Sequence, residues 1–234
     1  MNFQEFSPPI GHHRELNPKL WQGDNQLRSE VRGALLRIAE DFLEFVEVPV
    51  DVQDVVITGG NTGYDYTNHS DIDLHIITDM SQIACDREAE ELFDTKRLLY
   101  KHRYDLTIHG IPVELYIEDS SHPAVSAGVF SVQHNRWIKE PTQAPEPKYD
   151  QAEVQHWVKV WETIIQHAIK TGELVPCRHA LTLLRTYRKM GLKTSLGEYS
   201  TPNLVYKSLR NNKTVEAINL LIDRLHDQDL SVQY

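Results

Sequence analysis

The stretch that decides the fold is "TGGNTGYDYTNHSDIDLHIIT", residues Thr58 to Thr78. A β-branched run ends at Gly59-Gly60, a polar loop of ten residues follows, and Asp71 and Asp73 then alternate with aliphatic residues. Residues i and i+2 of a strand point to the same face, so these two carboxylates project together, about 7 Å apart along the strand. Paired carboxylates repel each other and are costly to desolvate. A divalent cation between them removes the repulsion, and oxygen ligands suit Mg²⁺ or Mn²⁺.

A third carboxylate is predicted to join this pair. In "PVELYI", residues 112–117, Val113, Leu115 and Ile117 share one face of a strand, and Glu114 lies on the other. If this strand lies beside that of Asp71, Glu114 reaches the same pocket. Two metal ions about 3.5–4 Å apart could then be held, one activating an attacking hydroxyl and one neutralising a leaving pyrophosphate.

The glycines predict a phosphate site next to the carboxylates. Glycine permits close backbone approach, so the amides around Gly60 and Asn61 could cradle a triphosphate, with Gly59 ending the strand. Ser70, directly before Asp71, either bonds phosphate or caps the loop. His75 continues the face of the aspartates, where it either contacts metal, phosphate or acceptor or is a hydrogen-bonded strand histidine.

Composition limits the function classes. The chain has 234 residues and a formal net charge of −10, which disfavours a protein that coats nucleic acid, although metal ions or basic patches can offset the repulsion. Cys85 and Cys177 are far apart and form no CxxC, so we expect reduced thiols. We find no secretory signal and no apolar run of the roughly 20 residues that cross a bilayer, so we expect a cytoplasmic protein without membrane contact.

The periodicity predicts an α+β chain. Residues 1–24 read as an arm whose Leu20 and Trp21 dock on the core. An apolar stripe predicts a helix that starts at Asn25 and is stopped by Pro49 and Asp51, and a second amphipathic helix covers residues 87–102. Two extended runs, 104–108 and 111–117, flank His109-Gly110, which predicts a hairpin because Gly110 can supply the positive φ of a two-residue turn. A long loop follows at 119–149, with "AGVFSV", residues 127–132, as an edge strand.

The last part is predicted to be all helical. Asp150 is a good N-cap for a helix that ends at Gly172. Further helices are expected from Pro176 to Gly191, from Pro202 onward and from about Thr214 to His226. The expected organisation is therefore an arm at 1–24, an α/β core at 25–148 and a helical domain at 149–234.

The joint pattern resembles the signature of the nucleotidyltransferase superfamily, which includes DNA polymerase beta, the CCA-adding enzymes and the minimal nucleotidyltransferases. Gly59, Gly60, Asp71, Asp73 and Glu114 match the order and spacing of that signature, with Gly-Gly where most members have Gly-Ser. The stretches "LNPKLW", "SDIDLH", "VELYIED", "SAGVFSVQHNRW" and "GEYSTPNLVYKSLR" also resemble predicted nucleotidyltransferases of large tailed phages. The resemblance implies a nucleotidyltransferase-type mixed sheet with flanking helices, a C-terminal helical bundle, a metal-dependent site and, for a phage protein, the host cytoplasm.

Some basic side chain must face the phosphates of a nucleotide bound beside three carboxylates. Lys96, Arg97, Lys101 and Arg103 form either a solvated helix face or such a contact, and Lys96 is the first choice because it lies on the apolar stripe. Arg178, Arg185 and Lys189 share another helical face, which is either solvated or a patch for triphosphate or an RNA backbone. Lys207, near Tyr206 and Arg210, is a further nucleotide-binding candidate, since a helical section often clamps the nucleotide in this superfamily.

The expected function is transfer of a nucleoside monophosphate from an NTP, with ATP among the candidates, to a hydroxyl. The acceptor is open between an RNA end, a nucleotide, a protein and a small molecule. Two alternatives remain: a catalytically silent nucleotide- or RNA-binding regulator, and a partner-binding protein on the same fold. The catalytic interpretation requires Glu114 to face Asp71 and Asp73 without a basic residue filling the gap among them.

Overall fold

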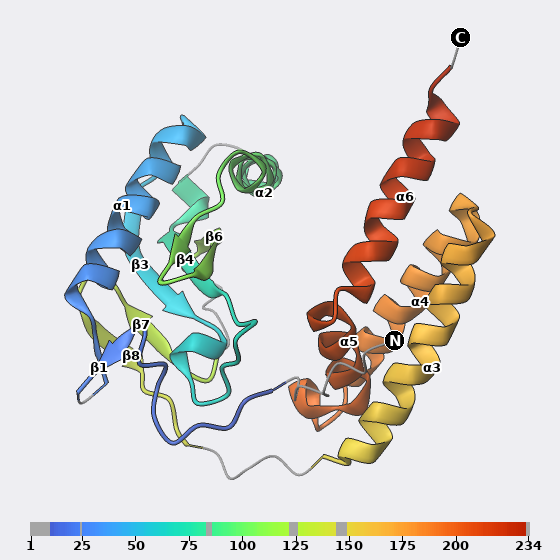
Figure 1. Ribbon diagram of the computed structural model, residues 1–234. Helices are drawn as coiled ribbons and strands as arrows, with labels where there is room; N and C mark the ends of the chain where they lie inside the picture. The colour runs from blue at the N-terminus through green and yellow to red at the C-terminus, as the bar shows by residue number, and fades with distance from the viewer. Residues whose placement is uncertain (1–9, 24, 83–85, 122–125, 144–148, 233–234) are drawn as a thin grey trace. The chain divides into compact units, whose positions relative to one another are not determined.

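The computed structural model describes residues 10–23, 25–82, 86–121, 126–143 and 149–232. The chain divides into two compact units, residues 11–145 and residues 146–234 together with residues 1–10. We describe each unit by itself (Figure 1). The boundary expected at residue 148 and Cys85 both lie outside the described residues.

The first unit is built on a mixed sheet with the strand order β5-β6-β4-β3-β7-β8. Its central strands β3 and β4 are antiparallel, whereas β4 and β6 are parallel. The strands are β3 (Val52–Thr58), β4 (Ile72–Thr78), β5 (Thr107–Ile108), β6 (Ile111–Asp119), β7 (Val129–Ser131) and β8 (Arg136–Lys139). The predicted α+β class with a mixed sheet is confirmed.

The connection between β4 and β6 brings a helix to the edge of the sheet. Parallel neighbours need a long crossover, and here it contains the 3₁₀ turn η2 (Met80–Gln82), the helix α2 (Asp86–Arg103) and the short strand β5. The predicted β5–β6 hairpin is confirmed, with a shorter first strand. His109 (φ 50°) and Gly110 (φ 77°) both have positive φ, as the two-residue turn of this kind requires.

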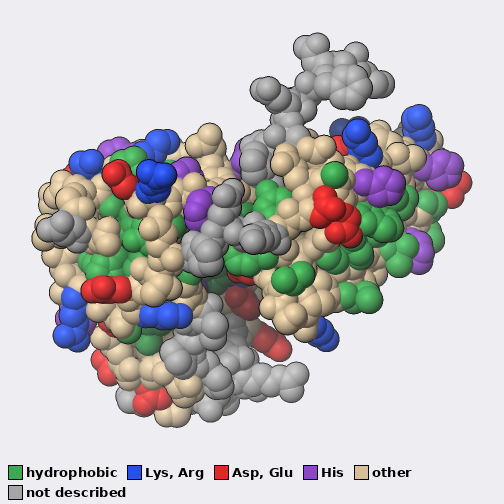
Figure 2. Space-filling model, turned by 90° about the horizontal axis from the view of Figure 1, so that it is seen from below, with side chains coloured by type: hydrophobic (Ala, Val, Ile, Leu, Met, Phe, Trp, Pro, Cys, Tyr) green, Lys and Arg blue, Asp and Glu red, His purple; other side chains and the backbone are tan. Residues whose placement is uncertain are grey.

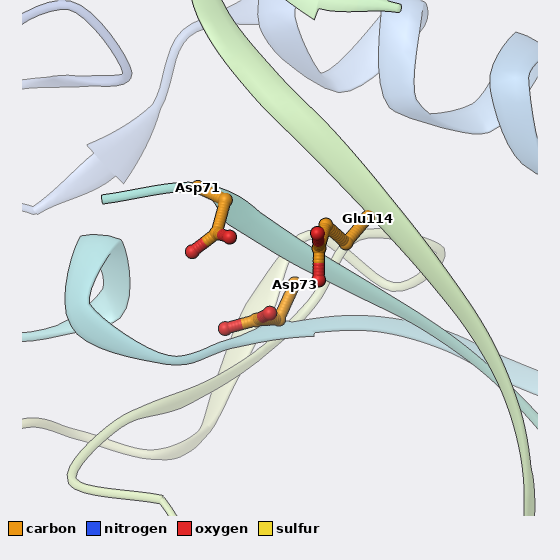
Figure 3. Close-up of side chains that lie close together, drawn as sticks. All are labelled: Asp71, Asp73 and Glu114. Carbon is orange, nitrogen blue, oxygen red and sulfur yellow. The ribbon is translucent and has the colours of Figure 1, made fainter. Parts of the chain in front are cut away.

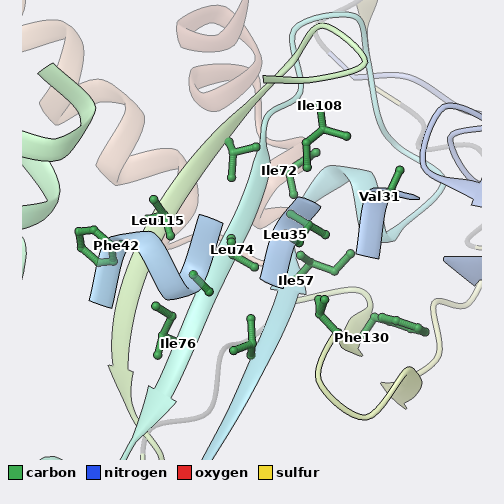
Figure 4. Packing of buried hydrophobic residues seen from close by; sticks show 14 of the residues in the cluster. Val31, Leu35, Phe42, Ile57, Ile72, Leu74, Ile76, Ile108, Leu115 and Phe130 are labelled. Atoms are coloured by element: carbon green, nitrogen blue, oxygen red, sulfur yellow. The ribbon is translucent and has the colours of Figure 1, made fainter. Parts of the chain in front are cut away.

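The core of this unit lies between the helix α1 (Ser29–Val46) and one face of the sheet (Figure 4). Val31, Leu35 and Phe42 on α1 are buried, as their spacing on one helix face predicts. Ile57 and Leu115 are among the sheet residues that pack in the same cluster. Removal of these apolar surfaces from water stabilises the layer by roughly 25 cal/mol per Å².

The start of α1 differs from the prediction. The helix begins at Ser29, four residues later than expected, because Gln26–Leu27 forms strand β2 and pairs with β1 (Trp21–Gln22). The predicted docking of Leu20 and Trp21 is confirmed, since both are buried in the core cluster. The Trp21 ring stacks on Trp137, and its indole N–H donates to the carbonyl of Asn61 over 2.8 Å.

The strand predicted within "AGVFSV" forms as β7, but it is not an edge strand. Val129–Ser131 pairs with β3 on one side and with β8 on the other. The prediction of a loop over residues 119–149 missed β8, since Arg136–Lys139 forms the outer strand of the sheet. This strand carries Trp137 between exposed or charged neighbours, so its apolar periodicity is too weak to predict it.

In the described part of the second unit, four helices form a bundle: α3 (Gln151–Thr171), α4 (Leu174–Leu192), α5 (Thr201–Asn211) and α6 (Thr214–Leu230). The Asp150 side chain accepts from the backbone N–H of Glu153, and Gly172 ends α3 in the left-handed conformation, both as predicted. Buried residues of all four helices form one apolar cluster, which Ile10 joins. The predicted helical bundle is confirmed.

The surface of the bundle also carries apolar side chains, which are visible on the right of Figure 2. Val175, Met190 and Leu220 are exposed by more than half. Within the described residues, we find no helix whose length and apolar character would let it cross a bilayer.

Candidate metal and nucleotide site

Three carboxylates converge on the face of the sheet that α1 leaves uncovered. Asp71 directly precedes β4, Asp73 lies within it, and Glu114 is the register partner of Asp73 on the parallel strand β6. One carboxylate oxygen from each residue lies within 4.8 Å of the other two. Figure 3 shows the three side chains turned toward a common space. Each of the three is half-buried.

Strand alternation places these acids. Ile72, Leu74 and Ile76 point into the core and are at most 1 % exposed, so the intervening residues of β4 must face the other way. On β6, Val113 and Leu115 are buried and Glu114 lies between them on the opposite face. The condition set by the sequence, that the strand of Glu114 lies beside that of Asp71, is met by the parallel pairing of β4 and β6.

Gly59 gives Asp73 its room. A Cβ atom on Gly59 would lie 1.9 Å from Oδ2 of Asp73, which is a severe clash. Its φ of 80° is also a conformation that side chains disfavour. The Gly59 amide donates to the hydroxyl of Ser126 over 3.1 Å. Gly60 then opens the 3₁₀ turn η1 (Gly60–Thr62).

Asn61 ties this turn to the beginning of β4. Its side chain is almost fully buried, and Nδ2 donates to the carbonyls of Ser70 (3.2 Å) and Asp71 (2.7 Å). Its Oδ1 accepts from Nδ2 of Asn17. The Asn61 amide group is thus engaged within the protein, and only the backbone around it remains for the predicted phosphate contact.

Two roles were predicted for Ser70, and the structure shows the one in which its side chain caps the loop. Its hydroxyl accepts from the backbone N–H of Thr67 over 2.9 Å, which closes the turn before Asp71. The same hydroxyl lies 3.3 Å from the place of a Cβ on Gly60, so Ser70 adjoins the glycine turn. A phosphate contact of Ser70 stays a prediction.

Lys101 is a cation that contacts one of the three acids, Glu114. Its ammonium donates to Oε1 of Glu114 from the last turn of α2, while the hydroxyl of Tyr116 donates to Oε2 over 2.8 Å. The guanidinium of Arg97, one turn earlier, lies 4.9 Å from the centre of the Tyr116 ring. The requirement of a gap without a basic residue is therefore met only in part: the three acids converge, and Lys101 engages one of them.

These contacts set the charge of Glu114. Burial by itself would raise the pKa of Glu114, but the hydrogen bonds from Lys101 and Tyr116 and the charges of Lys101 and Arg97 lower the pKa below its ordinary value. Glu114 is therefore ionised at neutral pH, as a metal ligand must be.

Lys96 points elsewhere. Its ammonium donates to the carbonyl of Phe45, lies 3.3 Å from a carboxylate oxygen of Glu47, and sits over the Phe45 ring. All of these partners are at the end of α1. Lys96 lies on the apolar stripe of α2, and this stripe faces the core. The side chain of Lys96 therefore extends along the core to the end of α1. Its predicted contact with nucleotide remains untested.

His75 is a hydrogen-bonded strand histidine. It is 7 % exposed, its Nε2 lies 3.0 Å from the hydroxyl of Thr58, and its Nδ1 lies 3.0 Å from Oε1 of Glu118. Its ring stacks on Tyr116 with 4.7 Å between the ring centres. Burial lowers the pKa of His75, against the opposing effect of Glu118. The ring of Tyr116 therefore contacts both the imidazole of His75 and the guanidinium of Arg97.

The remaining basic candidates belong to the helical unit. Lys207 pairs with Glu198 at 3.5 Å. Arg178 lies 3.0 Å from Nδ1 of His226, and Arg185 donates to the side chain of Asn219. These are contacts within the bundle, and a role of Lys207 or of this basic face in nucleotide binding stays a prediction.

Sequence reasoning missed two side chains that complete the site. Tyr116 follows Glu114 by two residues on the same strand face, so strand alternation could have identified it. Ser126, which accepts from the Gly59 amide, carries no local signal because it comes from a connection 67 residues further along the chain.

The donor set fits a divalent cation. Three carboxylates supply hard oxygen ligands within a few ångströms of one another. The carboxylate of Asp73 occupies space beside Gly59, because Gly59 has no Cβ atom that would clash with it. Asp71, Asp73 and Glu114 are thus the residues that could hold a metal ion.

Comparisons with known proteins add little to this geometry. No family model and no curated protein matches the chain. One similar solved structure is the STING-associated CdnE c-di-GMP synthase from Capnocytophaga granulosa, at 12 % identity over 87 % of this chain and 84 % of that chain, with a TM-score of 0.23. A likeness at this TM-score supports no conclusion about the site, so the function is inferred from the residues themselves.

Proposed function

We propose that the protein is a metal-dependent nucleotidyltransferase that moves a nucleoside monophosphate from an NTP to a hydroxyl and releases pyrophosphate. The observation that supports the proposal is the convergence of Asp71, Asp73 and Glu114 beside the Gly59–Gly60 turn. Three acids held together at the end of a strand destabilise a fold unless something positive binds among them. A phosphoryl-transfer site needs such an arrangement, because its catalysis is mostly charge neutralisation and positioning.

Each acid has a proposed role. Asp71 and Asp73 would hold Mg²⁺ or Mn²⁺, and Glu114 would bind the metal ion on the side of the attacking hydroxyl and help to remove the hydroxyl proton. The bound ions would neutralise the phosphates and favour loss of the hydroxyl proton. The acceptor oxygen forms a bond to the α-phosphorus, the bond from that phosphorus to the bridging oxygen breaks, and pyrophosphate leaves.

The backbone of the glycine turn is the proposed phosphate cradle. The amides of Gly60 and Asn61 begin η1, and the first N–H groups of such a turn lack partners within it. Gly59 precedes them, and the space left by its missing side chain holds the carboxylate of Asp73. Ser70, Lys96 and Lys207 remain nucleotide-binding candidates from the sequence, and Lys101 and Arg97 are two cations that act on Glu114.

A second candidate function is favoured by one contact. Lys101 neutralises part of the charge of Glu114, and a catalytically silent nucleotide- or RNA-binding protein could keep such a pair permanently. The two functions differ in turnover and in the need for metal. A silent binder would bind NTP equally well with and without divalent ions.

The test is transfer of label from each of the four α-³²P-labelled NTPs in the presence of Mg²⁺ or Mn²⁺, with cell extract as the source of acceptor. We expect label from at least one NTP in a larger product, and loss of that product with Asp73→Asn. Asp51→Asn is the matched control, because it removes the same charge from an exposed position before β3. NTP binding that is independent of metal, without any labelled product, would support the silent binder instead.

A further inference from the structure

Lys101 forms an ion pair with Glu114, a side chain that the proposed function assigns to metal binding. Its ammonium contacts Oε1 of Glu114, and this oxygen and its partner Oε2 are the only ligand atoms that Glu114 can offer. Tyr116 already donates to Oε2. Both oxygens of Glu114 therefore accept a hydrogen bond from the protein.

The two donors differ in how firmly they are held. Tyr116 comes from a central position of β6, stacks on His75 and carries Arg97 on its ring. Lys101 comes from the last turn of α2, and its side chain is 58 % exposed. A long, exposed lysine side chain can change partner at low cost, whereas the packed tyrosine cannot.

A positive charge at this position opposes a divalent cation. Like charges a few ångströms apart repel strongly where the surroundings are partly desolvated, and Glu114 is only 23 % exposed. An NTP brings about four negative charges to the same site. It therefore offers Lys101 a stronger partner than a single carboxylate does.

We propose that Lys101 is a built-in cation that holds Glu114 before nucleotide binds, weakens the binding of a divalent ion there, and transfers to the triphosphate when an NTP arrives. The inference rests on the proposed function and deepens it. It makes Lys101 a positioning residue for Glu114 before binding and a triphosphate ligand afterwards. Metal and nucleotide then bind with positive coupling, since each removes an obstacle to the other.

The test measures Mn²⁺ binding by electron paramagnetic resonance, without any turnover. In the absence of nucleotide, we expect Lys101→Gln to bind Mn²⁺ roughly tenfold more tightly than the unaltered protein. Lys101→Arg keeps the charge and should bind like the unaltered protein. Arg103→Gln is the matched control: it removes a charge two residues away, where the guanidinium lies over the Tyr104 ring, and should change the affinity by less than about twofold because solvent screens a more distant charge.

A double-mutant cycle separates a specific contact from a general charge effect. In the Glu114→Gln background, removal of Lys101 should change Mn²⁺ affinity far less than in the unaltered protein. A non-hydrolysable α,β-methylene NTP should also tighten Mn²⁺ binding more in the unaltered protein than in Lys101→Gln. Thermal unfolding of each variant checks that it is folded.

The failures are distinguishable. Equal Mn²⁺ affinity of the unaltered protein and Lys101→Gln, with measurable binding in both, would overturn the role of Lys101 and leave the proposed function in place. Absence of Mn²⁺ binding in both proteins would overturn the metal site and the proposed function with it.

Discussion

The carboxylate of Asp73 fills the space that a side chain at position 59 would need. The two residues are joined by the pairing of β3 with β4, in which Thr58 is the partner of Asp73. The absent Cβ of Gly59 would lie 1.9 Å from Oδ2 of Asp73. The glycine that ends one strand and the aspartate within the next therefore form one structural unit.

Gly59→Ala is expected to destabilise the protein and to displace Asp73. The backbone conformation of Gly59, φ 80° and ψ −162°, costs a residue with a side chain about 1–3 kcal/mol, and the clash adds to this cost. Urea unfolding should show the loss, and Mn²⁺ affinity should fall as well. Gly60→Ala is the matched control, because its Cβ would lie 3.3 Å from the hydroxyl oxygen of Ser70 and no closer than 3.8 Å to Cβ of Ser70 and Cα of Tyr66. Equal effects of the two variants would contradict the proposed role of Gly59.

Binding of a divalent ion to the three acids should stabilise the folded protein. A ligand at one hundred times its dissociation constant raises the free energy of unfolding by about 2.7 kcal/mol. We expect the melting temperature to rise with added Mn²⁺, and this rise to disappear in Asp73→Asn. The exposed-site variant Asp51→Asn should keep the full response. A response that survives in Asp73→Asn would place the ion elsewhere.

Asn61→Ala should loosen the start of β4. The substitution removes the donors to the carbonyls of Ser70 and Asp71 and leaves those partly buried carbonyls without this partner. Loss of a buried hydrogen-bonding partner costs about 1–3 kcal/mol, which urea unfolding can measure. Metal affinity should fall too, because Asp71 loses its anchor. A variant with unaltered stability would show that water or another side chain replaces the amide.

The pair of Lys101 and Glu114 should make stability depend on pH. Because the folded pKa of Glu114 lies below its ordinary value of 4.5, the pair stabilises the protein above that value, and this stabilisation is lost as the pH falls through the lowered pKa. Lys101→Gln should therefore be less stable than the unaltered protein at neutral pH. The difference should shrink as the pH falls from about 7 toward about 3, in urea titrations without metal.

The control for this pH dependence is Arg103→Gln, whose guanidinium lies over Tyr104 and does not contact Glu114. Its stability difference from the unaltered protein should stay nearly constant over the same range. A difference for Lys101→Gln that also stays constant would show that Lys101 does not control the pKa of Glu114.

Local patterns in the sequence determined much of this protein. The alternation from Asp71 to His75 predicted β4, and Asp150 and Gly172 predicted both ends of α3. These predictions succeed because strand alternation and helix capping depend on neighbours within a few residues. The start of α1 failed for the complementary reason: the apolar Leu27 fits the helical stripe, but its pairing with Trp21 takes it into a strand.

Only the tertiary structure decided how the site is assembled. No local pattern fixes that Glu114 pairs in register with Asp73, because the two strands are separated by a crossover that includes α2. The choice between Lys96 and Lys101 depends on where α2 lies along β6. The apolar stripe carries Lys96 to the end of α1, whereas Lys101, more than a turn later, reaches Glu114. The sequence supplies the charges, and the packing of the helix at the sheet edge selects which of them meet.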